Sequence, residues 1–321
     1  MAGAYQGGPV LAEVVRSGFV ESRHRGSVVA LGPDGALVAE VGDVRAPVFP
    51  RSANKPLQAV GMLRAGLRLA DPADLAVVCA SHSGEPEHLD RVAAMLDRAG
   101  LQEDQLRCPP DWPIGEQARW DWLRSGAPRR RIAMNCSGKH TGMLLTCLAA
   151  GWPGEGYWVP EHPLQRHLGA VVEELCGERA EAVGVDGCGA ALFSMSLAAL
   201  ASGFLRLVTA GQSTLERTVA DAMRAYPHLV GGAGPEREDS RLMAGVPGLL
   251  AKGGAEGVLA VALPGMGAVA LKVDDGAKRP VGAVAVAVLR RLGVRAPVLD
   301  ELASPRVLGG GEPVGEVRVV G

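Results

Sequence analysis

The stretch EGVLAVALPGMGAVALKV (residues 256–273) decides the fold class. Two apolar runs flank the break PGMG, so this stretch is predicted to form a β-hairpin. A second hairpin is expected in GSVVALGPDGALVAEVGD (26–43), where Pro33-Asp34-Gly35 provides the turn. Because hairpins pair their strands antiparallel, the sheet is not the purely parallel sheet of a Rossmann-type domain.

The rest of the chain is predicted to contain helices and one further strand. Helical periodicity and end signals place helices at residues 87–100, 139–150, 163–176 and 213–226. LAVVCA (75–80) is a short apolar run that ends at the polar Ser81, and we interpret it as a buried strand. Residues 101–131 show weak periodicity and contain three tryptophans, which favours packing under a loop over a lid. No linker divides the chain, so we expect a single domain (1–321) with a possible helical subregion at about 85–180.

The composition excludes several classes of protein. The 321 residues are 47% hydrophobic, with 33 basic and 35 acidic side chains and a net charge of −2, so disorder and bulk attraction to nucleic acid or anionic lipid are not expected. The first residues lack a signal peptide, and the longest apolar run, near 281–289, is far shorter than the roughly 20 residues that span a bilayer. Six cysteines in such a chain are predicted to be reduced. We therefore expect a soluble cytoplasmic protein that binds neither nucleic acid nor membranes.

Lysine is scarce, which directs attention to the few lysines that remain. Of the 33 basic residues only five are lysines, at positions 55, 139, 252, 272 and 278. Arginine supplies a permanent cation, whereas a lysine amine can become neutral and act as a base or a ligand. These lysines are therefore candidate positions for chemistry.

Two stretches contain serines that could be nucleophiles. In RSANKPLQ (51–58), Ser52 and Lys55 are three residues apart, a spacing that brings both side chains together on one helical turn. A serine hydroxyl needs a nearby base, and Lys55 could provide it if burial or another cation keeps its amine neutral. The alternative is a helix cap followed by a surface lysine. Ser81 directly follows the 75–80 run, where either a catalytic position or a simple turn fits.

A later lysine completes a pattern of serines and lysines. Lys252 opens KGGAEG (252–257), just before the hairpin that ends at residue 273. An SxxK pair with a later Lys-x-Gly before a strand is similar to the motif set of serine β-lactamases and penicillin-binding proteins. The middle Ser-Asp-Asn element of that set is missing, and Lys-Gly-Gly also suits a turn.

Cysteines and a lysine form a candidate metal site. NCSGKH (135–140) and DGCG (186–189) contain Cys136, Lys139 and Cys188, which offer two thiolates and an amine. Three such ligands and a water fit an open tetrahedral zinc site. The alternative is that these cysteines are small buried hydrophobic residues.

Together, the motifs resemble those of one known family. The match is to the rhizobial-type L-asparaginases, the third asparaginase class, and it extends over about residues 10–280. It is carried by RSGFVESRHRG (16–26), RSANKPLQ, ASHSGEPEH (80–88), NCSGKHTGML (135–144), HPLQ (162–165), DGCG, AKGGAEGV (251–258) and ALKVDDG (270–276). One departure is Ala190-Ala191 after DGCG, where the family pattern has a proline, and this could reshape the loop beside Cys188.

The resemblance implies a fold, an activity and a set of site residues. The fold would be α/β and serine β-lactamase/glutaminase-like: an α-β-α sandwich with a mainly antiparallel sheet and an added helical part. The protein would be a homodimeric amidohydrolase that converts L-asparagine to L-aspartate and ammonia, with one zinc ion per chain. The implied catalytic tandems are Ser52 with Lys55 and Ser81 with Lys252, the implied zinc ligands are Cys136, Lys139 and Cys188, and Arg51, His140 and Asp186 would support substrate binding.

Other functions remain compatible with the same residues. A serine acyl-hydrolase could act on another amide, such as glutamine or a β-lactam, and zinc-bound hydroxide could replace the serine as nucleophile. A non-enzymatic, zinc-stabilised amino-acid binder is the alternative from a different class. Asparaginases with a threonine nucleophile are disfavoured, because the chain contains neither TGGT nor a Gly-Thr dipeptide.

Overall fold

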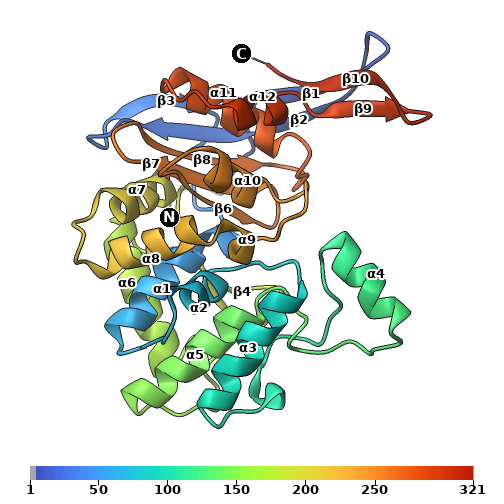
Figure 1. Ribbon diagram of the computed structural model, residues 1–321. Coiled ribbons are helices and arrows are strands. Elements are labelled where there is room, and N and C mark those ends of the chain that lie inside the picture. Colours follow the sequence, from blue (N-terminus) through green and yellow to red (C-terminus); the bar gives the residue numbers. More distant parts are fainter. Residues whose placement is uncertain (1–4, 321) are drawn as a thin grey trace.

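A curved antiparallel sheet lies between two layers of helices in the computed structural model, which describes residues 5–320 (Figure 1). The strand order is β6-β7-β8-β2-β1-β10-β9, and β3 pairs with β2 beside this path. The strands are β1 (Val10–Arg16), β2 (Phe19–Leu31), β3 (Leu37–Val41), β6 (Leu250–Gly254), β7 (Val258–Leu263), β8 (Gly267–Val273), β9 (Arg306–Gly309) and β10 (Glu312–Val319); β4 (Val183–Val185) and β5 (Ala191–Phe193) form a separate pair.

Both predicted hairpins are present. β7 and β8 pair antiparallel, with Ala260 opposite Ala270, and β2 and β3 pair around the Pro33-Asp34-Gly35 turn. Every strand pairing in the described residues is antiparallel. The expectation of a mainly antiparallel sheet in an α/β fold is therefore confirmed.

Helices cover both faces of the sheet. On one side lie α11 and α12, and on the other α7 packs directly on the sheet with a larger group of helices beyond it (Figure 1). The helices are α1 (Lys55–Arg64), α2 (Pro72–Val78), α3 (Pro86–Arg98), α4 (Glu116–Arg124), α5 (Ser137–Ala150), α6 (Pro163–Cys176), α7 (Leu197–Thr209), α8 (Leu215–Ala225), α9 (Pro227–Val230), α10 (Glu238–Gly245), α11 (Val281–Arg291) and α12 (Pro297–Leu302), with short 3₁₀ turns η1 (Arg51–Asn54) and η2 (Glu103–Gln105). The helices expected at 87–100, 139–150, 163–176 and 213–226 correspond to α3, α5, α6 and α8.

The strand expected at residues 75–80 is wrong, because this run belongs to helix α2. The Asp71 carboxylate caps the helix by accepting a hydrogen bond from Ala73 N at 2.9 Å, and Pro72 occupies the first turn. All side chains from Ala73 to Val78 are buried, since α2 packs against α3, α5, α8 and α9. Leu75–Val78 contain no polar side chain and therefore show no 3.6-residue periodicity, so this part of the helix has the sequence pattern of a buried strand. The charged residue before them, Asp74, is itself buried and pairs with Arg91 and Arg98.

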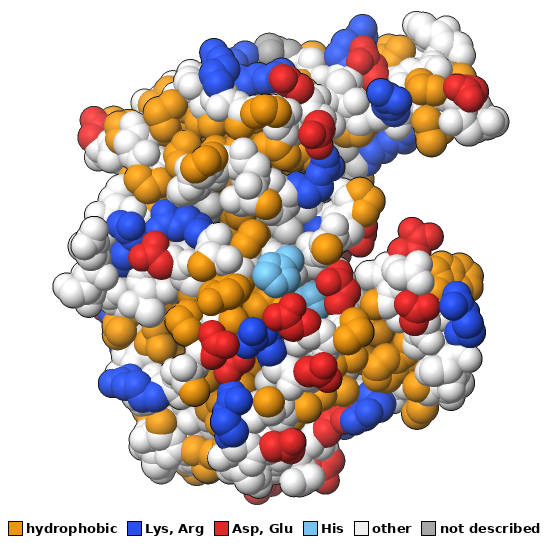
Figure 2. Space-filling model, viewed as in Figure 1, with side chains coloured by type: hydrophobic (Ala, Val, Ile, Leu, Met, Phe, Trp, Pro, Cys, Tyr) orange, Lys and Arg blue, Asp and Glu red, His pale blue; other side chains and the backbone are white. Residues whose placement is uncertain are grey.

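Residues 116–130, which include α4, form an exposed arm (Figure 1 and Figure 2), whereas Leu106 and Cys108 before it are buried in the core. The described structure buries none of the side chains of α4, and Trp120 is 57% exposed. Trp112 is contacted on its ring by the guanidinium groups of Arg119 and Arg129, at 5.3 and 4.1 Å. Trp120 therefore does not pack under a loop as expected, whereas Trp112 and Trp122 are partly buried and Trp122 Nε1 donates to Pro128 O at 2.9 Å. Between residues 5 and 320, no helix combines the length and the apolar character that crossing a membrane requires.

Candidate active site

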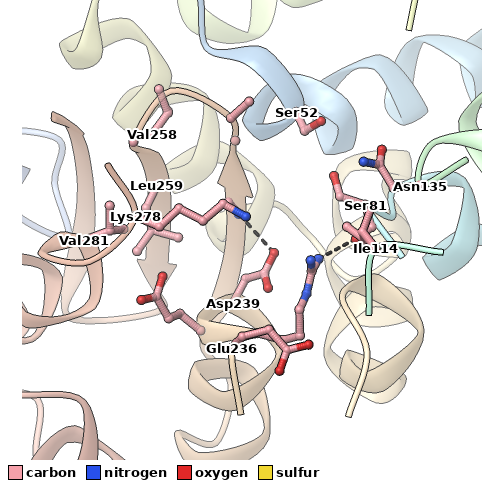
Figure 3. Close-up of a pocket in the computed structure, with 16 residues that line it drawn as sticks. Ser52, Ser81, Ile114, Asn135, Glu236, Asp239, Val258, Leu259, Lys278 and Val281 are labelled. Atoms are coloured by element: carbon pink, nitrogen blue, oxygen red, sulfur yellow. Dashed lines mark hydrogen bonds between the residues drawn. The ribbon is translucent and has the colours of Figure 1, made fainter. Parts of the chain in front are cut away.

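A small cavity brings together residues from seven separate parts of the described chain. Its volume is about 130 Å³, below the roughly 300–1,000 Å³ of pockets for drug-sized ligands, so it suits a small substrate. Figure 3 shows Ser52, Ser81 and Asn135 on one side of the cavity and Asp239 and Lys278 on the other. The first side comes from the helical layer, and the second from the start of α10, β6 and the loop before α11.

Lys55 lies between the two candidate serines in the fold. It is the first residue of α1 and only 1% exposed, and its Nζ donates hydrogen bonds to Ala80 O at 2.5 Å and Ser81 Oγ at 3.0 Å. In the described residues the only hydroxyl to which the Lys55 amine donates is therefore that of Ser81. Ser52 lies one helical turn before Lys55 and lines the cavity. The structure places all three groups at one site.

The environment of Lys55 favours a neutral amine. Burial is the main cause that lowers the pKa of Lys55 to about 7, and the nearby positive charges of Lys252 and Lys139 lower it further, while the thiolates of Cys136 and Cys188 oppose the shift. A large fraction of this amine is therefore unprotonated near neutral pH. A lysine with an ordinary pKa would be almost entirely charged and could not accept a proton.

Lys252 is completely buried on β6 behind Ser81. Its Nζ lies 2.7 Å from Gly253 O and 3.3 Å from Asp239 Oδ2, and this carboxylate also accepts a hydrogen bond from Gly253 N at 3.1 Å. Burial lowers the pKa of Lys252, although the negative charge of Asp239 acts in the opposite direction. The Arg237 guanidinium, beside the same carboxylate, donates to Ser81 O. In the described chain Lys252 makes no hydrogen bond to either serine.

The predicted metal-binding residues also come together. The sulfur atoms of Cys136 and Cys188 and one ring nitrogen of His140 all lie within 4.8 Å of one another, and all three residues are buried. Lys139 Nζ donates to Cys188 Sγ at 3.1 Å. The hydrogen bond from Cys136, together with the positive charge of Lys139, holds the pKa of Cys188 well below its usual value, whereas burial raises that of Cys136. Cys108 lies close enough to Cys136 to share a hydrogen bond with it.

His140 has the geometry of a further ligand. Its Nδ1 is 2.7 Å from the Tyr157 hydroxyl, which in turn accepts a hydrogen bond from Arg107 N at 2.9 Å. Its Nε2 is fully buried and makes no hydrogen bond of normal geometry in the described structure. A metal-binding histidine commonly has one ring nitrogen fixed by a neighbour and the other free for the ion. Two thiols with imidazole and amine nitrogens are a donor set that zinc prefers, so these residues fit a zinc site.

An ion pair connects the metal-binding cluster to the turn that carries Ser52. Arg51 Nε donates to Asp186 Oδ1 at 2.7 Å, and the other oxygen of this carboxylate lies 3.5 Å from Cys188 Sγ. Arg51 has a φ of 51°, in the left-handed region that costs a residue with a side chain roughly 1–3 kcal/mol. Asp186 therefore helps to hold η1 in a strained conformation next to Ser52.

These features agree with the family to which the sequence is matched. An α/β fold with an antiparallel sheet, a cavity lined by two serines and a buried lysine hydrogen-bonded to one of them define a site suited to acyl transfer. The L-asparaginase II family matches residues 12–319, nearly the whole chain, and the protein belongs to this family. This is a family of L-asparaginases, so membership favours an enzyme over the alternative of a non-enzymatic binder.

Solved structures with a partly similar fold come from two groups of proteins. The native crystal structure of Mglu is 17% identical with a TM-score of 0.44; the alignment covers 84% of this chain and 63% of that one. A β-lactamase from Mycobacterium bovis is also 17% identical with a TM-score of 0.44, over 84% and 95% of the two chains. A β-lactamase from Burkholderia vietnamiensis is 18% identical with a TM-score of 0.32, over 87% and 91%. No curated protein sequence matches this chain.

The sequence motifs predicted the two serines on one side of the cavity, but they did not predict the charged residues at the start of α10 on the other side. Arg237, Glu238 and Asp239 lie in the stretch PEREDSR, which has the composition of a solvated loop and no catalytic pattern. The sequence drew attention to Lys278 only because lysine is scarce, with five in the chain, and to Asn135 because it is one of two asparagines. Arg51 and Asp186, by contrast, both lie in predicted blocks and are paired in the structure.

Proposed function

We propose that this protein is an L-asparaginase that hydrolyses the side-chain amide through a serine acyl-enzyme. The observation that carries the proposal is the buried Lys55 amine, which donates a hydrogen bond to Ser81 and lies one turn from Ser52. Both serines line a small cavity. The small volume and charged walls of the cavity suit a short, polar amino acid.

Ser52 is the proposed nucleophile. Neutral Lys55 takes the hydroxyl proton of Ser52, directly or through the hydroxyl of Ser81, and Ser52 Oγ attacks the amide carbon. The Lys55 ammonium then returns the proton to the departing nitrogen, which leaves as ammonia. Water cleaves the resulting ester, Lys55 again exchanging the proton, and aspartate and free Ser52 are formed. A pKa of about 7 lets Lys55 act in both directions.

Lys252 and Asp239 have a supporting role in this proposal. The positive charge of Lys252 favours the neutral form of Lys55, because like charges lower each other's pKa. Asp239 fixes Lys252 in place, and Arg237 fixes the backbone of Ser81. In this proposal Ser81 and Lys252 are the second hydroxyl–amine couple, although they are not hydrogen-bonded to each other in the described residues.

Zinc is the proposed metal, one ion per chain. It would be held by the thiols of Cys136 and Cys188 with Lys139 and His140 as nitrogen donors, and it would supply a fixed positive charge that orients the substrate. Arg51 and Asp186 connect this cluster to Ser52, so a change in the cluster is expected to alter the position of the nucleophile. A cytoplasmic homodimer is the further part of the proposal that comes from the family resemblance.

The test is ammonia release by the purified protein from L-asparagine, L-glutamine and a β-lactam, the last followed by its ring opening. We expect turnover of asparagine at least 10 times faster than of the other two. Ser52→Ala should lower kcat by at least about 1,000-fold, as loss of a serine nucleophile does elsewhere. Ring opening of the β-lactam as the fastest reaction, or full activity of the Ser52 variant, would contradict the proposal.

A further inference from the structure

One side of the cavity carries two opposite charges that the proposed acyl transfer does not use. Glu238 is the first residue of α10, and Lys278 precedes α11. Both residues line the same cavity as Ser52 and Ser81. Figure 3 shows Lys278 on the side opposite the two serines. Lys278 is one of only five lysines in the chain, and the others in this cavity region, Lys55 and Lys252, are already engaged.

Neither charge is neutralised by a contact of its own. No side-chain hydrogen bond or ion pair within 4.0 Å of either Glu238 or Lys278 exists in the described residues, in contrast to Asp239, which binds Lys252 and Gly253 N. The positive charge of Lys278 nevertheless lies near enough to favour the ionised form of Glu238. The two groups thus line one cavity and interact electrostatically without forming an ion pair.

The surroundings of Glu238 make a cationic partner favourable. Burial, and then the negative charge of Asp239, raise the pKa of Glu238 to about 7. A carboxylate that is costly to ionise gains more from an added cation than an exposed one does. Gly282 leaves space for this side chain, because a Cβ at that position would lie only 3.2 Å from Glu238 Oε1.

We propose that Glu238 and Lys278 determine specificity by binding the α-ammonium and the α-carboxylate, respectively, of a free amino-acid substrate. This inference rests on the proposed function, and it names the substrate class: amides that carry both charges, in preference to amides within a peptide or a simple acid amide. A zwitterion placed between the two side chains satisfies both, and its side-chain amide extends across the cavity toward the serines. Uncharged or singly charged amides leave at least one of the two charged side chains in the cavity without a partner.

The experiment compares three substrates on the wild-type protein and two variants. The substrates are L-asparagine, succinamate, which lacks the α-amino group, and 3-aminopropanamide, which lacks the α-carboxylate. The variants are Glu238→Gln and Lys278→Met, and the control is Glu116→Gln, because Glu116 is the first residue of α4 as Glu238 is of α10 but lies outside this cavity. Ammonia release gives kcat and KM, and thermal melting reports whether each variant is folded.

The expected effects are selective. The wild type should favour asparagine over either truncated amide by about 10- to 100-fold in kcat/KM, the range for a hydrogen bond to a charged group. Glu238→Gln should raise KM for asparagine by about 10-fold or more with little change in kcat, and should leave kcat/KM for succinamate within about twofold. Lys278→Met should do the same for asparagine and spare 3-aminopropanamide. Glu116→Gln should change none of these values.

Several results would overturn the inference while leaving the proposed function intact. Equal losses for asparagine and succinamate in Glu238→Gln would show that the residue acts on the fold or on catalysis in general. Wild-type protein that cleaves the truncated amides as well as asparagine would refute the inference without any variant. Failure to hydrolyse asparagine, with rapid cleavage of another amide, would instead contradict the proposed function.

Discussion

Replacing Lys55 by methionine separates the catalytic and the structural roles of this buried amine. Methionine has a similar length and no charge, so Lys55→Met removes the proposed base with little change of volume. The amine is 1% exposed and donates to Ala80 O and Ser81 Oγ. Loss of a general base typically lowers the rate about 100- to 10,000-fold, and we expect kcat to fall within or beyond this range.

The effect of this variant on stability should depend on pH. The pKa of Lys55 is lowered from 10.5 to about 7 in the folded protein, so between these values the unfolded chain binds a proton that the folded protein does not. The contribution of Lys55 to the free energy of unfolding of the wild type therefore rises between pH 7 and pH 10.5, by about 1.4 kcal/mol per pH unit. It is lowest below pH 7, where both the folded and the unfolded protein bind the proton. Over the whole window the contribution amounts to about 5 kcal/mol.

Two terms then compete in the variant. It leaves two buried acceptors without their donor, at about 1–3 kcal/mol each, but it also removes the cost of burying a charged amine. At pH 7 the terms nearly cancel, so the free energy of unfolding should be close to that of the wild type. At pH 9 about half of the second gain has disappeared, and Lys55→Met should be less stable than the wild type by about 2 kcal/mol.

Urea denaturation of the wild type and of Lys55→Met at pH 7, 8 and 9 measures this difference in the free energy of unfolding. Subtracting the two free energies cancels the contributions of groups that titrate alike in both proteins. Lys278→Met is the control for stability, because this lysine is exposed and makes no side-chain hydrogen bond or ion pair in the described residues. A stability difference between wild type and Lys55→Met that stays constant with pH would refute the argument, as would full activity of the variant.

Further predictions concern the cluster, the pH profile and the packing of η1. Cys188→Ser should reduce bound zinc from about one ion per chain to a small fraction, measured by elemental mass spectrometry, with Cys147→Ser, a buried thiol outside the cluster, retaining it. For the wild type, kcat/KM for asparagine should rise as pH passes upward through about 7, because Lys55 must lose its proton to act as a base; a profile that falls with pH from 6 to 8 would contradict this. Gly254→Ala should lower kcat and destabilise the protein, since the added Cβ would lie 2.6 Å from Pro50 O and displace η1; unchanged activity and melting temperature would show that η1 tolerates the shift.

The sequence was most informative where local chemistry determines structure. The hairpins follow from turn residues such as Pro33-Asp34-Gly35 between alternating strands, and the helix ends at Gly151 and Gly177 adopt the left-handed conformation that glycine favours. α2 was misassigned because its residues Leu75–Val78 contain no polar side chain. Only tertiary packing settles such a segment.

The candidate site divides in the same way. Ser52, Lys55, Cys136 and Cys188 lie in motifs whose residue types already indicate chemistry, and the structure brings these motifs together. The pairing of Lys55 with Ser81, and the use of Arg237 and Asp239 to fix Ser81 and Lys252, depend on contacts between distant segments that no spacing encodes. His140 became a candidate ligand only when its free Nε2 was seen beside the thiols.

The most direct test of the central claim is to trap the acyl-enzyme. Acid quenching of the protein during steady-state turnover of L-asparagine, followed by intact-mass measurement and peptide mapping, reports any covalent intermediate and its position. We expect a mass increase of one aspartyl group on the peptide that contains Ser52, and no such increase in Ser52→Ala. Rapid turnover with no adduct on any serine, or an adduct confined to the peptide that contains Ser81, would contradict it.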